Sequence, residues 1–374
     1  MDNYMGFYNC LLQEILEDVY NFYEDNTDFI RFSLREENKC SFKDSVKELF
    51  KKIIRRSKFG AHTVFTDKFI TQDVTQFDFE GLNWLFNLLG NEYSKRVMIK
   101  IIAYRILGKE RVRLPLNKQT YWDQRKKINA MIDKRKEPVQ VDFMNWELPF
   151  FNFSENNFDI KLFSRNPQNI FFIKQYEYIK EEVKIKAEKG DYVIDAGGCW
   201  GDTALYFALE TAPNGMVYSF EFIPSNLKVM KKNLLMNPDL EKRIKCIEKP
   251  IWIQSGIQLN YIDNGPASRI IEHNNFDNVT SASTISIDDF VIENNLKRID
   301  FIKMDIEGAE LKALKGAREA LRKFKPKLAI SVYHSLSDYI AIPQYINSLN
   351  LGYSFYLNHY TIHSEESILY ATTE

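Results

Sequence analysis

Residues 191–201, Asp-Tyr-Val-Ile-Asp-Ala-Gly-Gly-Cys-Trp-Gly, decide the fold of this chain. Tyr192 to Ala196 form a short apolar run of the kind found in buried strands, and two adjacent glycines close it. A helical pattern begins at Asp202 and continues to Leu209. A buried strand, a glycine turn and a helix form the start of a βαβ unit, in which backbone can approach a ligand above the carboxyl end of the strand.

The spacing of the glycines narrows the class of ligand. No Gly-x-x-x-x-Gly-Lys-Ser/Thr sequence occurs, so the turn is not a phosphate-cradling P-loop. Gly197 and Gly198 are adjacent, so the dinucleotide pattern Gly-x-Gly-x-x-Gly is not matched either. The pattern that remains is Asp-x-Gly-Gly-x-x-Gly. Its first residue, Asp195, lies inside the predicted strand, and its last residue is Gly201.

Length and composition indicate two domains and no nucleic-acid partner. The chain has 374 residues and a net charge of −1, so a global polyanion partner is not indicated. No apolar run approaches the roughly 20 residues of a membrane span, and we expect none. The cysteines lack the paired spacing of a disulfide framework or a zinc site, and they stand at Cys10, Cys40, Cys199 and Cys246. We therefore expect a reduced, cytoplasmic protein.

Residues 1–140 are predicted to form a helical N-terminal domain without a chemical motif. Apolar residues recur at helical spacing in three blocks, at about 8–23, 42–54 and 81–107. These stripes are expected to pack against each other or against a second copy of the chain, so a homo-oligomer through the N-terminal helices is one expectation. The pattern then loosens, and Pro138 and Pro149 place the domain boundary near 138–150.

Residues 150–374 are predicted to form a Rossmann-like, doubly wound α/β domain with a mostly parallel seven-stranded sheet. The expected strands are 192–196, 216–220, 244–247, 299–304, 328–333, 353–357 and 368–371, with 284–287 as a further strand-like run. The expected helices are 177–188, 203–209, 224–235, 288–294, 309–324 and 338–349. A hairpin of 158–163 and 170–173 should precede them, and 254–282 should hold a small hairpin. The last two strands have no helix between them, so the last strand is expected to be antiparallel.

Acidic residues at the ends of two predicted strands are the candidate ligand contacts. Glu221 lies where a carboxylate can accept hydrogen bonds from both hydroxyls of an adenosine ribose. Asp305 and Glu307 follow a second apolar run, and carboxylates there need a partner to offset their desolvation. Glu310 is interpreted as a charge that favours the start of the next helix.

The block from Phe301 to Glu310, Phe-Ile-Lys-Met-Asp-Ile-Glu-Gly-Ala-Glu, with Leu-Lys-Gly-Ala at 314–317, resembles the signature of the FkbM family of methyltransferases. Residues 193–206, 219–224 and 286–290 are similar to other motifs of that family. The glycine turn itself resembles the first motif of class I S-adenosylmethionine-dependent methyltransferases. The resemblance covers about 158–372.

This resemblance implies S-adenosylmethionine as the methyl donor and O-methylation of sugar or polyketide hydroxyls, often in antibiotic, capsule or polysaccharide biosynthesis. It also implies a cofactor site at the turn, the helix start and the acidic strand ends, made of Asp195, Gly197, Gly198, Trp200, Gly201, Asp202, Thr203, Glu221, Phe222 and Asp305. The family's usual Glu after the strand at 328–331 is absent, and Ser-Val-Tyr-His stands at 331–334. The acceptor-side roles are therefore less defined than the donor site.

His334 ends its strand beside the expected positions of Asp305 and Glu307. A sugar hydroxyl is a poor nucleophile, so methyl transfer is helped by a base or by a metal ion. We predict that His334 is the base. The alternative is that Asp305, Glu307 and His334 bind one Mg²⁺ or Mn²⁺, since oxygen-rich ligand sets suit hard cations. His359, in the last loop, is a weaker candidate for contact with the acceptor.

Tyr121, Trp122 and Arg125 are predicted to bind the acceptor, because sugars stack on aromatic rings and arginine binds phosphate with two parallel hydrogen bonds. The alternative is a linker that packs on the catalytic domain. The sequence thus predicts an O-methyltransferase that acts on a sugar, either nucleotide-activated or within a glycan, with a polyketide or other small-molecule hydroxyl as the alternative. A nicotinamide-dependent oxidoreductase, against which the glycine spacing argues, and a non-catalytic binding module are the rival classes.

Overall fold

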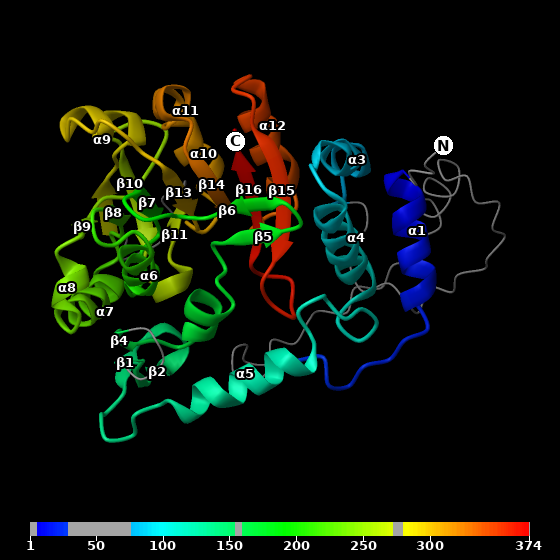
Figure 1. The fold of residues 1–374 in the computed structure, drawn as a ribbon, viewed down its shortest axis with the longest axis horizontal. Coiled ribbons are helices and arrows are strands. Elements are labelled where there is room, and N and C mark those ends of the chain that lie inside the picture. Colours follow the sequence, from blue (N-terminus) through cyan, green and yellow to red (C-terminus); the bar gives the residue numbers. More distant parts are fainter. Residues whose placement is uncertain (1–5, 29–75, 154–158, 272–279, 374) are drawn as a thin grey trace.

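The computed structural model describes residues 6–28, 76–153, 159–271 and 280–373 (Figure 1). The helices of its N-terminal part are α1 (Phe7–Asp18), α3 (Phe79–Leu88), α4 (Glu92–Leu107) and α5 (Gln119–Ala130). The helical block predicted at 42–54 lies outside the described residues. The block predicted at 81–107 is two helices, because Asn91 caps a new helix by accepting a hydrogen bond from the amide of Ser94.

A seven-stranded sheet lies at the centre of the rest of the chain (Figure 1). In spatial order its strands are β15 (Ser354–His359), β16 (Ser367–Thr372), β14 (Lys327–Ser331), β13 (Phe301–Met304), β7 (Tyr192–Ala196), β8 (Met216–Phe220) and β9 (Ile244–Ile247). The strands from β14 to β9 run parallel, whereas β16 is antiparallel to both β14 and β15. The predicted α/β fold with a mostly parallel seven-stranded sheet is confirmed.

The direction of winding reverses beside β7. From β7 the chain proceeds outward to β8 and β9, and then returns to β13 on the other side of β7. Ligands of such sheets bind beyond the carboxyl ends of the strands at this reversal. The glycine turn that follows β7 therefore lies where the fold provides a binding site.

Helices cover both faces of the sheet. Val193 of β7 packs on one face with α6 (Asp202–Glu210) and α7 (Pro224–Leu235). The next residue, Ile194, packs on the other face with α9 (Ile287–Glu293), α10 (Glu310–Lys315), α11 (Arg318–Phe324) and α12 (Asp338–Ser348). Both side chains are fully buried, which explains why β7 is apolar without alternation. The short helix α8 (Pro238–Glu241) precedes β9.

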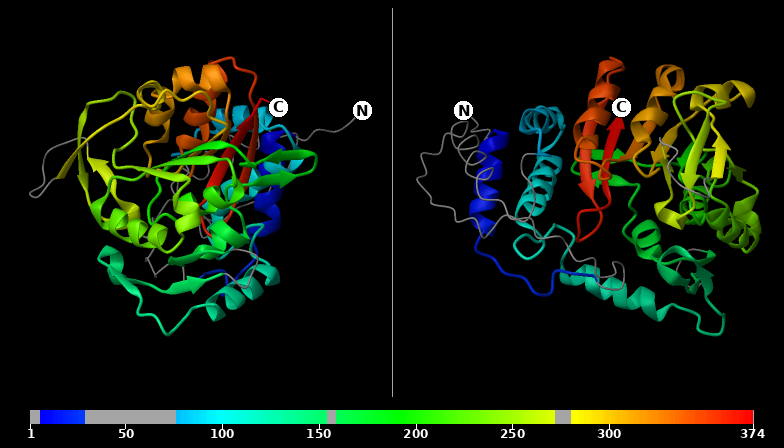
Figure 2. Two further views of the ribbon diagram at one scale, coloured as in Figure 1. Left: turned by 60° about the vertical axis from the view of Figure 1, so that its left-hand side comes forward. Right: turned by 180° about the vertical axis from the view of Figure 1, so that it is seen from behind.

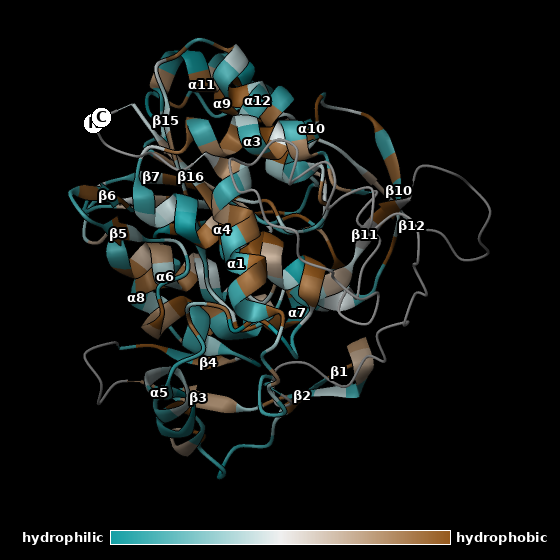
Figure 3. Cartoon of the chain, turned by 90° about the vertical axis from the view of Figure 1, so that its right-hand side faces the viewer, coloured by the Kyte–Doolittle hydropathy of each residue, from teal (hydrophilic) through white to brown (hydrophobic). Residues whose placement is uncertain are grey.

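The N-terminal helices pack against the β15 edge of the sheet. In Figure 2, α1 and α4 lie beyond the β15–β16 pair, and Figure 3 looks onto them from that end. The amide of Gly90 donates to the carbonyl of Phe355, and the amide of Leu357 donates to the hydroxyl of Ser94. Apolar side chains of these helices and of the sheet form one continuous core. The helices thus cover a sheet edge that would otherwise expose unpaired backbone groups.

The helix predicted at 177–188 is wrong. This stretch forms an antiparallel hairpin of β5 (Tyr178–Lys180) and β6 (Val183–Ile185). Tyr178 is buried and Ile179 is 53% exposed, which is the alternation of a strand. The many Lys and Glu residues of the stretch favour a helix intrinsically, and tertiary packing overrides that preference.

The leading hairpin predicted from 158–163 and 170–173 is also wrong. β4 (Lys161–Phe163) pairs with β3 (Phe150–Asn152), and Gln168–Phe172 forms a π-helix instead of a strand. Apolar runs of three or four residues do not distinguish strand from helix, and the Phe-rich runs here are of that length. A further hairpin, β1 (Val139–Val141) with β2 (Trp146–Leu148), precedes them.

Three other elements differ from expectation. The helix predicted at 309–324 is divided into α10 and α11 at Gly316, where a Cβ would meet the carbonyl of Trp252 at 2.2 Å. The run 284–287 is not a strand, because Ser286 caps α9. The section 254–282 contains a three-stranded antiparallel sheet rather than a hairpin, made of β10 (Gln258–Ile262), β11 (Arg269–Ile271) and β12 (Thr280–Ser283). In the described part of the chain, no helix has the length and apolarity to cross a membrane.

Candidate functional site

Two connected hollows open at the carboxyl end of the sheet. The larger cavity has a volume of about 550 Å³, and the recess beside it has about 80 Å³. Their linings share five residues, Gly197, Cys199, Pro266, Asp305 and Glu307. Because these residues come from the turn after β7, the end of β13 and the loop before β11, the two hollows meet where the sheet changes direction.

The turn after β7 requires glycine at its first position. Gly197 has φ of 85°, and a Cβ on it would lie 2.0 Å from the carbonyl oxygen of Asp305. The amides of Gly197 and Gly198 both donate to the carbonyl of Phe220, at 3.0 and 2.9 Å. The turn is therefore held between the ends of β8 and β13, with its backbone at the wall of both hollows. Gly201, with φ of 82°, precedes the first residue of α6.

Asp195 supports this turn from beneath and lines neither hollow. Its buried carboxylate accepts hydrogen bonds from Thr203 Oγ1 at 2.9 Å and from Ser219 Oγ at 2.7 Å. Lys303 Nζ lies 3.1 Å from the same carboxylate. The predicted role of Asp195 as a direct cofactor contact therefore has no geometric support, because its oxygens face the protein interior.

Glu221 lies in the wall of the recess and is 6% exposed. Its carboxylate accepts hydrogen bonds from the amides of Phe222 and Ile223, at 2.8 and 2.7 Å, and from Asn226 Nδ2 at 3.3 Å. Burial raises the pKa of Glu221 to about 7, although these hydrogen bonds favour the charged form. Asn226 Oδ1 also lines the recess and has no hydrogen-bond partner among the described residues.

The other residues that were predicted to bind the cofactor lie in different places. Phe222 lines the recess and packs edge-on against Tyr261, with ring centroids 5.0 Å apart. Trp200, Asp202 and Thr203 line the larger cavity. Gly198 and Gly201 line neither, and they shape the backbone.

The thiol of Cys199, a residue that lines both hollows, is held in its neutral form. Burial, together with the nearby carboxylate of Glu221, raises the pKa of Cys199 well above its usual value. The backbone of Cys199 has φ of 43°. This thiol is therefore a poor nucleophile, and its contribution is the shape of the wall.

Asp305 lies at the junction of the two hollows and is held by two tyrosines. The hydroxyls of Tyr176 and Tyr333 each lie 3.2 Å from one of its oxygens. Burial, reinforced by the charge of Asp305, raises the pKa of both tyrosines well above the usual value, so both hydroxyls remain protonated and donate. Glu307 follows with φ of 56°, a strained backbone conformation that is frequent at functional sites.

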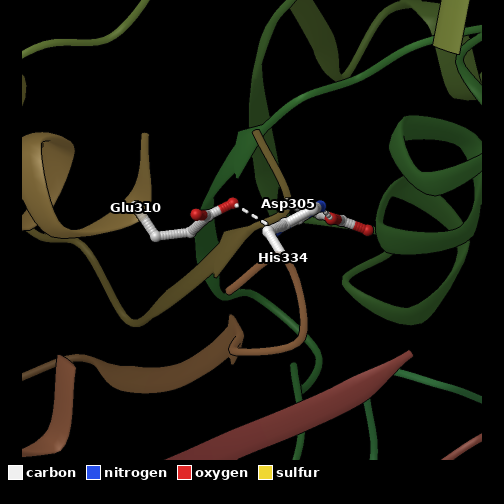
Figure 4. A group of neighbouring side chains, drawn as sticks. All are labelled: Asp305, Glu310 and His334. Carbon is white, nitrogen blue, oxygen red and sulfur yellow. Dashed lines mark ion pairs between the residues drawn. The ribbon is translucent and has the colours of Figure 1, made fainter. Parts of the chain in front are cut away.

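His334 is surrounded by carboxylates. Its Nε2 lies 3.4 Å from Asp305 and 3.8 Å from Glu307, and its Nδ1 lies 3.3 Å from Glu310. Figure 4 shows Asp305 and Glu310 approaching the ring from opposite sides. Burial opposes a charge on the ring, but the three carboxylates outweigh it and raise the pKa of His334 to about 11. The imidazole is therefore a cation at neutral pH.

The larger cavity has an aromatic and polar far wall. Arg165 lies over the ring of Trp146, with its guanidinium carbon 4.4 Å from the ring centroid. Thr27, Tyr104 and Lys109 contribute from the N-terminal part of the chain. The loop between β15 and β16 adds acidic and polar groups, namely His363, Ser364, Glu365 and Glu366.

The four residues predicted to bind the acceptor do not line either hollow. Tyr121 donates to Asp28 at 2.6 Å, and Arg125 forms an ion pair with the same carboxylate at 3.4 Å. Trp122 donates to Asn117 at 2.9 Å. These residues hold α5 against the segment that contains Thr27, in agreement with the alternative of a packed linker.

His359 is likewise engaged in the interior. Its Nδ1 is 2.8 Å from the hydroxyl of Ser367, and its Nε2 is 2.6 Å from the carbonyl of His363. It fixes the β15–β16 loop that reaches the larger cavity. Sequence reasoning chose His359, whereas the lining residue is His363, four positions later in the same loop.

Sequence reasoning missed Trp146, Arg165, Tyr176 and Lys303. Lys303 carried a signal, since a lysine inside an apolar strand must find a partner. Trp146 and Arg165 lie in short irregular segments before the sheet, where no periodicity marked them. Only the packing of β1–β4 against α7 and Trp200 brings them to the cavity.

Comparisons with known proteins show what this chain is similar to. Residues 185–355 match the model of the methyltransferase FkbM domain. The crystal structure of an FkbM methyltransferase from Methylobacillus flagellatus superposes with a TM-score of 0.50 and 19% identity, over 89% of this chain and 72% of that one. The comparison with curated protein sequences gave no match.

Two further solved structures superpose over a smaller part of the chain. Aeropyrum pernix fibrillarin, which contains bound S-adenosyl-L-methionine, has a TM-score of 0.36 and 13% identity over 63% of this chain and 93% of its own. An S-adenosylmethionine-dependent O-methyltransferase from Thermotoga maritima has a TM-score of 0.30 and 14% identity over 50% and 60%. The resemblance seen in the motifs is supported by the family model, because residues 185–355 are similar to the methyltransferase FkbM domain.

Proposed function

We propose that this protein transfers a methyl group from S-adenosylmethionine to a hydroxyl of a sugar, either nucleotide-activated or within a glycan. The observation that carries the proposal is the junction of the two hollows. A narrow recess with a buried carboxylate opens into a cavity large enough for a small-molecule acceptor, and Asp305 and Glu307 line both. A donor in the recess would therefore present its reactive end to an acceptor in the cavity.

We place the adenosine part of the donor at the recess, which opens into the larger cavity. Glu221 has lone pairs left to accept from the ribose hydroxyls, and the unpartnered Asn226 Oδ1 lies in the same wall. The missing side chain at Gly197 lets the turn lie close to the end of β13, with its backbone at the wall of the recess. When bound, S-adenosylmethionine supplies a methyl group already activated on a sulfonium, so the chain's own task is to orient the acceptor oxygen and to take its proton.

The larger cavity fits a polyhydroxylated acceptor. Its wall combines aromatic rings, which stack on sugar faces, with carboxylates and amides, which accept from hydroxyl groups. Arg165 adds a cation that suits the phosphate of a sugar nucleotide. We favour the sugar over a polyketide because of these hydroxyl-accepting groups and the cation of Arg165.

We assign the role of the base, which takes the proton of the acceptor hydroxyl, to Glu307 rather than to His334. A base must be unprotonated to work, and His334 at neutral pH is already a cation. Burial raises the pKa of Glu307, which makes it a stronger base, and Glu307 lines both hollows. His334 then holds the acidic groups in place as their counter-charge. Glu307→Gln should lower turnover by about 10²–10⁴-fold with donor affinity kept.

The metal alternative has a different ligand set from the predicted one. Asp305, Glu310 and His334 are the residues whose ligand atoms gather within 4.8 Å in the described part of the chain. Glu310 is fully buried and already accepts from the amide of Ile306 at 2.8 Å. Mg²⁺ keeps several waters in its shell, which this interior position does not favour. We therefore expect turnover to persist in a chelator, and loss of turnover with recovery on adding Mg²⁺ or Mn²⁺ would overturn this view.

The proposed function is tested with the full chain in two steps. Isothermal titration with S-adenosylmethionine, S-adenosylhomocysteine, NAD⁺ and NADH separates a methyltransferase from an oxidoreductase. Transfer of labelled methyl is then measured on sugar nucleotides, oligosaccharides and polyketide alcohols. Transfer only to polyketide alcohols would overturn the proposal that the acceptor is a sugar. Binding of S-adenosylmethionine without any methyl transfer would favour a binding module.

Residues 1–140 are proposed as the acceptor-side region, and residues 150–374 as the methyltransferase domain. Thr27, Tyr104 and Lys109 in the cavity wall support the first assignment. The apolar stripes of α1, α3 and α4 are used within the chain, against the β15 edge. If two copies assemble through these helices, they must use a face of the helices other than these stripes. Measuring the mass of the protein in solution tests whether two copies assemble.

A further inference from the structure

Lys303 is a buried lysine in a central strand. It is the third residue of β13, its exposed fraction is 0%, and its neighbours Phe301, Ile302 and Met304 are apolar and buried. Its Nζ lies 3.1 Å from Asp195 and donates to the carbonyls of Ala196 and Gly197, at 3.0 and 2.6 Å. All three donors of the ammonium are therefore used at the end of β7.

Burying an ion pair is a costly way to stabilise a sheet. Apolar residues of similar volume often serve as well or better, and β13 is otherwise built of them. The pair therefore needs a reason other than the stability of the fold. The two carbonyls supply one, because they belong to the last residue of β7 and to the first residue of the glycine turn.

The Lys303 ammonium fixes the direction of the peptide groups in the turn. Ala196 O also accepts from the amide of Asp305, at 3.1 Å. Gly197 O lies beyond the strand pairing, which ends at Ala196 and Met304. The ammonium thus extends the attachment of β7 to β13 by one residue, into the segment that lines both hollows.

We infer that Lys303 is a positioning residue that holds the Ala196 and Gly197 carbonyls and so preforms the turn against which the donor binds. The inference rests on the proposed function for the identity of the donor. Asp195 is the counter-charge of the ammonium and not itself a ligand contact. Burial opposes the charge, but Asp195 and Asp305 raise the pKa of Lys303, so the ammonium keeps all three of its donor hydrogens.

Two variants separate positioning from structural support. Lys303→Met leaves Asp195 buried without a counter-charge, and we expect a lower midpoint of urea unfolding, or no folding. Lys303→Met combined with Asp195→Asn removes both charges, and we expect the midpoint to recover. The Asn side chain keeps polar groups for Thr203 and Ser219, but the two carbonyls still lack their donor.

Binding and hydrogen exchange are then measured on the double variant. Isothermal titration should show that the affinities for S-adenosylmethionine and S-adenosylhomocysteine fall by about tenfold or more. This is the loss expected for hydrogen bonds to a charged group. Hydrogen exchange of the peptide covering 196–205 should be faster without any ligand. The control is Lys100→Met, which removes an ion pair to Asp18 in the N-terminal helices and should alter neither reading.

The outcomes distinguish this inference from the proposed function. A double variant with recovered stability, wild-type affinity and unchanged exchange at 196–205 would overturn the role of Lys303 alone. Failure of the unaltered protein to bind either donor compound would overturn the proposed function. The exchange measurement would still decide whether Lys303 holds the turn.

Discussion

The recess and the larger cavity are built in different ways. Every described residue that lines the recess lies between Gly197 and Ala309, within one continuous part of the sheet domain. The described lining of the larger cavity extends from Thr27 to Glu366. One hollow is therefore made by neighbouring strand ends, and the other by segments that only the complete fold brings together.

This difference separates what is fixed from what can vary. The recess depends on backbone geometry, on the turn at Gly197 and on a single strand-end acid, Glu221. The larger cavity depends on side chains from loops and short hairpins, which tolerate change more readily than strands do. A fold of this kind can keep its donor site while its acceptor site changes.

The largest expected effect is on the donor side, at Gly197. Gly197→Ala would place a Cβ 2.0 Å from the Asp305 carbonyl, in a backbone conformation that L-residues avoid. The turn and β13 cannot both keep their positions, so we expect binding of S-adenosylmethionine to fall below detection in isothermal titration.

A matched control isolates the contact from the backbone strain. Gly190 has φ of 88°, yet a Cβ there would meet nothing within 4 Å. Gly190→Ala should lower the free energy of unfolding by about 1–2 kcal/mol and leave donor affinity unchanged. Equal loss of binding in both variants would show that strain alone, and not the close approach to Asp305, explains the effect.

The same difference explains what could be predicted from the sequence. Gly197, Glu221 and Asp305 lie in local motifs, where strand, turn and acid follow each other within a few residues. Their convergence follows from the rule that parallel strands end at one edge. The parallel strands and most helices after β7 are therefore predicted to within a few residues of the observed bounds; the exceptions are α8 and the division of 309–324 into α10 and α11.

The acceptor side carried no such local signal. Tyr121 and Arg125 have the chemistry of sugar and phosphate contacts, yet they are buried in the attachment of α5. Trp146 and Arg165 have the same chemistry and line the cavity. Residue type cannot distinguish the two pairs, because the distinction depends on how short hairpins such as β1–β2 pack against α7 and Trp200, which lie far away in the sequence.

His334, at the junction of the two hollows, is expected to have the next largest effect. His334→Gln leaves three carboxylates without a counter-charge, and loss of one partner of a buried ion pair costs about 3–5 kcal/mol. The pKa of His334 is raised to about 11 in the fold from roughly 6.5 in the unfolded chain. Its contribution is therefore full below about pH 6.5 and is lost as the pH rises toward 11.

Urea unfolding of both proteins at pH 6.5 and at pH 9.5 measures this dependence. The difference in the free energy of unfolding between wild type and His334→Gln should be smaller at the higher pH. A difference that is constant across this range would mean that His334 is neutral in the fold. His334, as a neutral imidazole, would then again be the candidate base.

Glu221→Gln should have a smaller effect, confined to the recess. We expect the affinity for S-adenosylmethionine to fall about tenfold, because a hydrogen bond to a charged group contributes about 1.5–3 kcal/mol. The pKa of Glu221 is about 7, so donor affinity of the unaltered protein should rise as the pH increases through 7. The variant should lack this rise, as measured by titrations between pH 6 and pH 8.

The control for Glu221 is another acid just beyond the end of a strand. Glu248 follows β9, is 53% exposed, pairs with Lys231 and is not among the described residues that line the recess. Glu248→Gln should leave both the affinity and its pH dependence unchanged. If Glu221→Gln behaves in the same way, the carboxylate does not touch the donor.

The smallest expected effect is on the acceptor side, at Arg105 of α4. Its Nη2 donates to the carbonyl of Tyr333 at 3.3 Å and to that of Ser364 at 3.2 Å, and so ties two segments of the cavity wall to the N-terminal helices. Arg105→Met removes both hydrogen bonds, each of which contributes about 0.5–1.5 kcal/mol. Hydrogen exchange should become faster in 361–368 and stay unchanged in 196–205, with donor affinity kept. Arg111→Met, which removes a hydrogen bond to the carbonyl of Asn21 outside the cavity, is the control. Arg105→Met could instead lower the affinity for S-adenosylmethionine as much as Glu221→Gln does. The two hollows would then be mechanically coupled, and the division between a fixed donor side and a variable acceptor side would not hold.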